Sequence, residues 1–162
     1  MNADDYIIRP PQTQEEWDEI QGLLLDYRKE FNDSACFTSF EEEMVNIQNV
    51  YNTPGSQLFI AVEESDNKIV GCVAMRTLSH GVAEMKRLYV IPPCRGLHLG
   101  ENLALEILNF AEEKKYKSMV LDTMHEMHAA QKLYQQLGFT KTEPYREQDP
   151  STVVCYRKIF TQ

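Results

Sequence analysis

Residues 84–100 read EMKRLYVIPPCRGLHLG, and an apolar repeat with helical spacing begins directly after them. The first seven residues have the composition of a β-strand, and the Pro-Pro pair that follows cannot continue its hydrogen-bond ladder. Gly96 and Gly100 allow a tight turn that exposes N–H groups at the start of a helix. These amides converge with the positive end of the helix dipole, and Arg95 adds a fixed charge. The stretch therefore predicts a strand, an anion-binding turn and a helix, with a phosphate or pyrophosphate as the natural ligand.

The turn also has a purely structural interpretation, because many strands enter helices through glycine turns that bind nothing. The chain contains neither G-x-x-x-x-G-K-S/T nor G-x-G-x-x-G. A nucleoside triphosphate or dinucleotide site is therefore not supported.

Two further blocks accompany the turn. An acidic residue, Glu84, stands eleven positions before the arginine, and residues 133–139 read LYQQLGF. Together with the R-x-x-G-x-G/A pattern at residues 95–100, these blocks resemble the GNAT acyl-CoA N-acyltransferases. The resemblance is well defined over about residues 82–139.

The resemblance implies a single α/β (α+β) domain over residues 1–162, with a central mixed sheet of about seven strands and about four helices. It implies an enzyme that moves an acetyl group from acetyl-CoA to a primary amine by direct transfer in a ternary complex. The acceptor stays open, because family acceptors range over amino acids, polyamines, antibiotics and protein amines. The alternative is a non-catalytic acyl-CoA-binding module used for sensing or assembly. A homodimer is compatible with either.

Acetyl transfer to an amine needs a base, because an ammonium of pKa about 10.4 is about 3.4 units from neutral at pH 7. The position of the family's base corresponds to Glu84, whose structural alternative is an exposed strand carboxylate paired with Lys86. The acid for the leaving thiolate corresponds to Tyr134, whose alternative is an aromatic anchor between helix and sheet.

The resemblance also implies where the cofactor binds. In the family the strand before the turn splays from its parallel neighbour, so its amides can bind the pantetheine arm and the thioester carbonyl. The pyrophosphate is expected on the amides of the turn. The expected cofactor contacts are Leu88, Tyr89, Val90, Arg95, Gly96, Leu97, His98, Leu99, Gly100 and Glu101.

Two positions depart from the family pattern. Met127 stands where an Asn is frequent, and His98 replaces the middle glycine of the turn. The histidine adds a β-carbon without removing the N–H, so phosphate binding is expected to survive if its φ is negative. A positive φ would make the turn strained.

In the family the acceptor is selected by the first two helices and by the loop before the last strand. The expected pocket residues are the aromatic side chains Tyr27, Phe31, Phe37 and Tyr145. Asp26, Glu30 and the acids at 41–43 are available to attract a cationic amine. Exposed helix residues or ordinary core aromatics are the alternative.

The composition suits one globular domain, with 43% hydrophobic and 25% charged residues in 162. A net charge of −9 argues against a nucleic-acid groove and against docking on an anionic membrane. It is compatible with a cationic substrate or with solubility alone. We therefore expect a small-molecule or peptide amine as partner, and neither nucleic acid nor membrane.

Cysteine and histidine spacing gives no metal signature. The four cysteines form no C-x-x-C pair, and residues 125–128 read HEMH, which is not H-E-x-x-H. With no long apolar run, a reduced cytoplasm fits best, and we expect no metal.

Sequence patterns also predict the elements. Thr13 and Glu16 match a capping box, and Gly138 matches a helix C-cap. The strands within 57–90 should form an antiparallel meander, and the helix after it should cross to a parallel strand. The expected strands are 6–9, 57–64, 68–77, 82–90, 118–123, 139–142 and 153–160, and the expected helices are 13–31, 39–51, one from 100 and 127–137.

Overall fold

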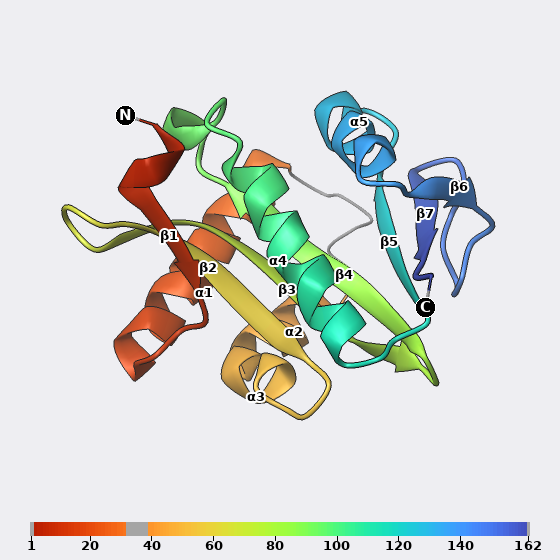
Figure 1. The fold of residues 1–162 in the computed structure, drawn as a ribbon, viewed down its shortest axis with the longest axis horizontal. Helices are drawn as coiled ribbons and strands as arrows, with labels where there is room; N and C mark the ends of the chain where they lie inside the picture. Colours follow the sequence, from red (N-terminus) through yellow and green to blue (C-terminus); the bar gives the residue numbers. More distant parts are fainter. Residues whose placement is uncertain (1, 32–38, 162) are drawn as a thin grey trace.

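The structure is a computed structural model that describes residues 2–31 and 39–161. Within these residues the chain forms one mixed sheet of seven strands, in the order β1-β2-β3-β4-β5-β7-β6 (Figure 1). The strands are β1 (Tyr6–Arg9), β2 (Gln57–Glu63), β3 (Lys68–Ser79), β4 (Val82–Val90), β5 (Ser118–Met124), β6 (Thr140–Thr142) and β7 (Val153–Ile159). The helices are α1 (Gln14–Glu30), α2 (Phe40–Val45), α3 (Ile47–Tyr51), α4 (Leu99–Glu113) and α5 (His128–Gln136), with short 3₁₀ turns at Ala3–Asp5 and Pro92–Cys94.

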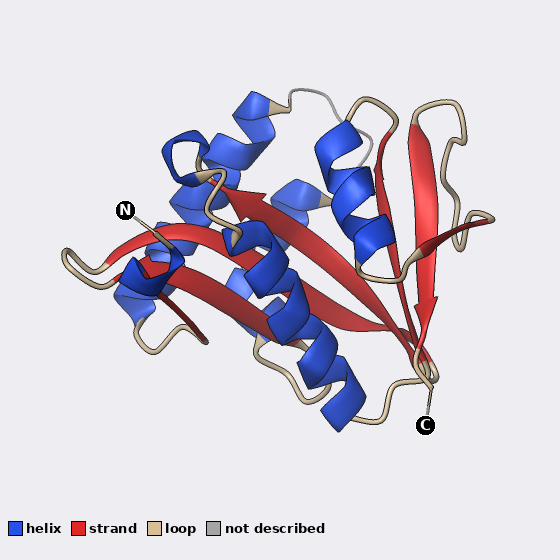
Figure 2. Cartoon of the chain, turned by 45° about the horizontal axis from the view of Figure 1, so that its top comes forward, coloured by secondary structure: helices blue, strands red, loops and turns tan. Residues whose placement is uncertain are grey.

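The connections follow the predicted plan. Strands β1 to β4 pair antiparallel in chain order, and α4 then crosses to β5, which pairs parallel to β4. The β4–β5 pairing is short, because it joins only Val82–Glu84 of β4 to 118–120 of β5. Beyond Glu84 the two strands diverge, and Figure 2 shows the two groups of strands opening from a common corner. This divergence creates the space for a site.

Helices cover both faces of the sheet. Helix α4 packs on one face with the buried side chains of Leu103 and Ile107. Helices α1, α2 and α3 pack on the other face, where Ile20, Leu24 and Phe40 are buried (Figure 1). Apolar periodicity in the sequence therefore identifies the core-facing side of both layers.

The prediction of one helix over residues 39–51 is wrong. Asn46 has φ −133° and ψ 38°, so the segment divides into α2 and α3, and five helices replace the expected four. Asparagine is a poor interior helix residue because it favours local bonds to the backbone. The break also accompanies an inward turn of Glu43, which is buried beside the sheet.

The predicted capping box is half formed. Thr13 Oγ1 accepts the N–H of Glu16 at 3.1 Å and caps α1. The Glu16 carboxylate turns to Arg9, at 2.6 Å, and to the amide of Gln12. The ion pair with the strand residue thus takes the place of the second capping bond. Gly138 follows α5 with φ 96°, as expected of a C-cap glycine.

Candidate active site

A cavity of about 480 Å³ lies where β4 and β5 diverge. It is lined by the end of α1, by residues 85–90 of β4, by Arg95, by the end of β5 and by the first turns of α5. This volume is in the range of small-molecule sites. The elements around it come from both halves of the chain, so the site depends on the complete sheet.

A β-bulge shapes the β4 wall of the cavity. Between the pairs Ala74–Lys86 and Cys72–Tyr89, β4 advances three residues while β3 advances two. The extra residue accompanies Arg87, whose φ is 62°. Successive strand residues normally point to opposite faces, but the bulge lets Lys86 and Arg87 both reach Glu43.

The carboxylate of Glu43 is buried below this wall. Arg87 Nε lies 2.6 Å from it, Lys86 Nζ lies 3.6 Å from it, and the Tyr51 hydroxyl donates to it at 2.6 Å. Burial alone raises the pKa of Glu43, but the two cations outweigh burial and hold that pKa below its ordinary value. Glu43 is therefore ionised, and its carboxylate is engaged by Arg87, Lys86 and Tyr51.

Glu84 is buried, with an exposed fraction of 1%, and does not line the cavity. It accepts hydrogen bonds from the Tyr145 hydroxyl at 2.7 Å and from Arg146. Burial raises its pKa, but Lys86, Tyr145 and Arg146 together lower it. The structural alternative of an exposed carboxylate does not hold, because Glu84 is buried, although Lys86 does interact with it.

Arg146 also joins the two diverging strands. Its second terminal nitrogen donates to Asp122 on β5 at 3.1 Å, and Gln148 donates to the same oxygen at 2.7 Å. Asp122 lines the cavity. The loop before β7 is thus fixed to the floor of the site through Arg146.

Tyr134 on α5 lines the opposite side of the cavity and is 7% exposed. Its ring packs edge-on against the ring of Phe139, with 5.9 Å between the two ring centroids. On the facing side, Leu88, Tyr89 and Val90 of β4 also line the cavity, as predicted for cofactor contacts. The structure therefore brings the predicted acid and the predicted strand contacts together.

The turn before α4 is strained at one position. Gly96 has φ 86°, which glycine adopts readily, but His98 has φ 62° and stands at the N-cap of α4. This is the positive-φ alternative considered for His98. Residues 96–98 precede α4 and residues 99–101 begin it, and none of them lines the cavity, whereas Arg95 does.

The predicted acceptor residues separate into three groups. Tyr27 and Phe31 line the cavity. The Tyr27 ring stacks on the Tyr89 ring, with 4.7 Å between the two ring centroids. Tyr145 does not line it, because its hydroxyl is directed to Glu84. Phe37 lies outside the described residues.

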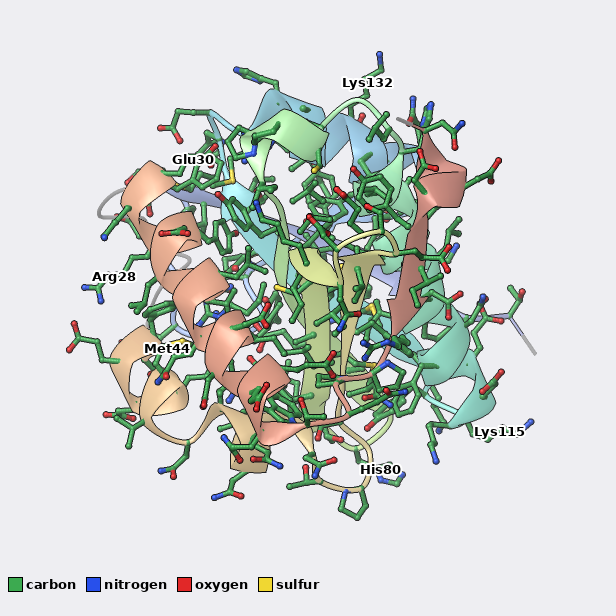
Figure 3. The ribbon with its side chains drawn as sticks, turned by 90° about the vertical axis from the view of Figure 1, so that its left-hand side faces the viewer. Arg28, Glu30, Met44, His80, Lys115 and Lys132 are labelled. Carbon is green, nitrogen blue, oxygen red and sulfur yellow. The ribbon has the colours of Figure 1, made fainter. Side chains whose placement is uncertain are left out.

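Three of the acids expected to attract a cation are paired with arginines of the same chain. Glu30, which Figure 3 shows at the end of α1, lies 2.7 Å from Arg95. Glu41 lies 2.9 Å from Arg28, and Glu43 is buried. Asp26 does not line the cavity. The charges of Glu30, Glu41 and Glu43 are therefore compensated within the chain.

Sequence reasoning missed four polar residues of β4 and β5 that line the cavity. Lys86 and Arg87 stand side by side within a strand, and this break in its apolar pattern is a signal that was available. Asp122 and Thr123 end an apolar strand and also line the cavity. A charge at the end of a buried strand is a comparable signal.

The described residues contain no group of three or more His, Cys, Asp or Glu placed to hold a metal ion. None of the helices found in residues 2–31 and 39–161 is both long and apolar enough to cross a bilayer.

Comparison with known proteins assigns the family. The sequence matches the Acetyltransferase (GNAT) family over residues 17–139. An uncharacterized N-acetyltransferase of Schizosaccharomyces pombe is 35% identical over 158 residues, which are 97% of this chain and 96% of that protein. N-acetylaspartate synthetase of Homo sapiens is 32% identical over 122 residues, covering 74% of this chain and 40% of that protein. The chain belongs to the GNAT family and is an acetyltransferase.

Solved structures agree with this assignment at the level of fold. An acetyltransferase from Streptococcus agalactiae 2603 matches with a TM-score of 0.81 at 20% identity, covering 96% of this chain and 99% of that one. The PaiA N-acetyltransferase of Thermoplasma acidophilum, solved in complex with coenzyme A, matches with a TM-score of 0.71 at 16% identity, covering 96% and 99%. The expected GNAT fold is confirmed.

Proposed function

We propose that this protein transfers an acetyl group directly from acetyl-CoA to a primary amine within a ternary complex. The observation that carries the proposal is the cavity between β4 and β5, which has strand backbone on one side and Tyr134 on the other. A thioester placed along β4 would lie between these walls. The coenzyme A complex of the PaiA neighbour supports an acyl-CoA donor.

The proposed roles follow from position. The amides of β4 near Leu88 and Val90 bind the thioester carbonyl and stabilise the oxyanion. The amides of residues 96–101 and the charge of Arg95 hold the pyrophosphate. Glu84 takes the proton of the amine through water or through its polar neighbours, and Tyr134 protonates the departing thiolate. No covalent enzyme intermediate is required.

Acetyl-CoA with a panel of primary amines tests the proposal through the release of coenzyme A thiol. The panel includes amino acids, because relatives named N-acetylaspartate synthetase form an N-acetylated amino acid. We expect release that depends on one class of amine and an acetylated product of the corresponding mass. Tight acetyl-CoA binding with no transfer to any amine would favour the sensor or assembly module instead.

A further inference from the structure

Charged side chains of both signs, among them Lys86, Arg87 and Asp122, line the cavity next to β4 and β5. The charges below β4 and β5 form one cluster within the described residues, in which two groups of ion pairs are joined by the interaction of Lys86 with both Glu43 and Glu84. Its cations are Arg76, Lys86, Arg87 and Arg146, and its carboxylates are Glu43, Glu84 and Asp122. Arg76 is 42% exposed and does not line the cavity, so the three other cations face an equal number of carboxylates.

Lys86 is the member of this cluster with the weakest compensation. Its side chain is 8% exposed and lines the cavity, and its ion pair with Glu43 is 3.6 Å long. The two oxygens of Glu43 already accept from Tyr51 and Arg87, each at 2.6 Å. Within residues 2–31 and 39–161, no acceptor lies within hydrogen-bond distance of the Lys86 ammonium.

A buried ammonium has three N–H donors, and leaving them without acceptors is costly. Burial and the neighbouring Arg87 lower the pKa of Lys86, and the nearby carboxylates of Glu43 and Glu84 only partly oppose this. An anionic group in the cavity would provide the missing acceptor.

The other charged side chains that line the cavity and are shielded from solvent already have partners. Arg95 pairs with Glu30, Arg87 pairs with Glu43, and Asp122 accepts from Arg146. Glu126 and His128 also line the cavity, but both are exposed to solvent. Lys86 is therefore the cation best placed to meet an anion of the substrate.

We propose that the acceptor is an amine that also carries a carboxylate, such as a free amino acid, and that this carboxylate pairs with the ammonium of Lys86. The inference rests on the proposed acetyl transfer, and Lys86 acts as a residue that determines specificity. Polyamines and other purely cationic amines are poor acceptors for such a site, because they bring a further positive charge to its floor.

Matched pairs of substrates test the proposal without any change to the protein. Free α-amino acids, aspartate and glutamate included, are compared with their α-carboxamides by the release of coenzyme A thiol. We expect kcat/KM to be about tenfold or more higher for the acid, because the amide loses a charge-assisted hydrogen bond. Carboxamides that react as well as the acids would overturn the proposal.

The Lys86→Met variant tests whether the preference for the acid depends on Lys86. Methionine keeps the apolar length of the side chain, and its folding is checked by thermal unfolding. We expect KM for the acid to rise about tenfold or more while kcat/KM for the amide stays within about twofold. A matched control, Lys68→Met, removes an exposed lysine at the start of β3 and should change neither value. An equal loss of kcat for acid and amide would instead assign Lys86 to the thioester oxyanion and overturn the proposal.

Binding supplies a readout that does not depend on turnover. In the presence of coenzyme A, the amino acids should raise the Tm of the wild-type protein, and the carboxamides should not. The rise should disappear in Lys86→Met. A rise without any acetylated product would support carboxylate binding and contradict the proposed reaction, and no rise for any amino acid would contradict the inference.

Discussion

Arg95 lies 2.7 Å from the carboxylate of Glu30, and this ion pair joins the turn before α4 to the end of α1. The Nε of Arg95 also donates to the Val90 carbonyl at 2.9 Å, and its guanidinium lies over the Tyr89 ring. Because the turn is on the proposed donor side and α1 on the proposed acceptor side, the pair would link the two halves of the proposed site. It also fixes the position of the arginine before any phosphate binds.

Arg95→Ala should weaken acetyl-CoA binding by about 1 to 3 kcal/mol, because a charge-assisted phosphate contact and the order of the turn are lost. Calorimetry measures the affinity directly. Glu30→Gln is the matched control, since it breaks the ion pair but keeps the cation, and it should not weaken binding. Unchanged affinity in Arg95→Ala would mean that the pyrophosphate does not lie on this turn.

Glu84→Gln should lower the rate at neutral pH by about 10² to 10⁴, and high pH should partly restore it because the amine then loses its proton in solution. The rate is measured from neutral to alkaline pH. Glu147→Gln removes an exposed acid from the loop that carries Arg146 and should leave the rate unchanged. If Asp122→Asn reproduces the predicted profile while Glu84→Gln does not, the base is Asp122, which lines the cavity.

Tyr134→Phe should lower kcat by about 10²-fold if the phenol protonates the thiolate. Phenylalanine keeps the ring that packs at 5.9 Å against Phe139, so the Tm should change little. Steady-state kinetics and thermal unfolding together separate the two roles of this side chain. A wild-type kcat in this variant would leave Tyr134 as an aromatic anchor.

The fold was predictable because its signals are local. The antiparallel meander of residues 57–90, the crossing helix after Gly100 and the C-cap at Gly138 are each specified by a few neighbouring residues. Pairing of β4 with β5 followed from that connection. The break at Asn46 was missed because the apolar spacing of residues 39–51 continues through it.

The charged part of the site was not predictable in the same way. Glu84 reaches Arg146 across 62 positions of the chain, and Arg87 reaches Glu43 across 44. Such partners are decided by the packing of the loop before β7 and of α2 against the sheet. Strand alternation would place the side chains of Lys86 and Arg87 on opposite faces of the sheet, and the bulge at Arg87 changes this, so that both reach the same side. A motif can identify Glu84 but cannot state which cations surround it.

His98→Gly should stabilise the protein by about 0.5 to 1 kcal/mol. A left-handed conformation costs a residue with a β-carbon about 1 to 2 kcal/mol. Glycine avoids this cost, but it also raises the conformational entropy of the unfolded state, which offsets part of the stabilisation. Thermal unfolding should show a Tm higher by about 1 to 3 °C. His98→Ala keeps the β-carbon and should bring no gain. A lower Tm in His98→Gly would indicate that the 3.4 Å contact with Glu101 outweighs the strain.

Acid should unfold this protein partly through Glu43. Its pKa is held below the ordinary 4.5 in the folded state, despite burial, by Arg87 and Lys86. A carboxyl whose pKa is lower when folded stabilises the protein above its unfolded pKa and loses this contribution as the pH falls through the folded pKa. The wild-type free energy of unfolding should therefore decline progressively below about pH 4.5.

Glu43→Gln should remove that part of the acid dependence and destabilise the protein at neutral pH by about 3 to 5 kcal/mol, because Arg87 is left buried without its carboxylate. Denaturant unfolding from neutral to acid pH measures both effects. Glu42→Gln, at an exposed neighbouring position of α2, should leave the curve unchanged. A Glu43→Gln curve parallel to the wild type would mean that other carboxyls, with Glu84 first among them, carry the acid sensitivity.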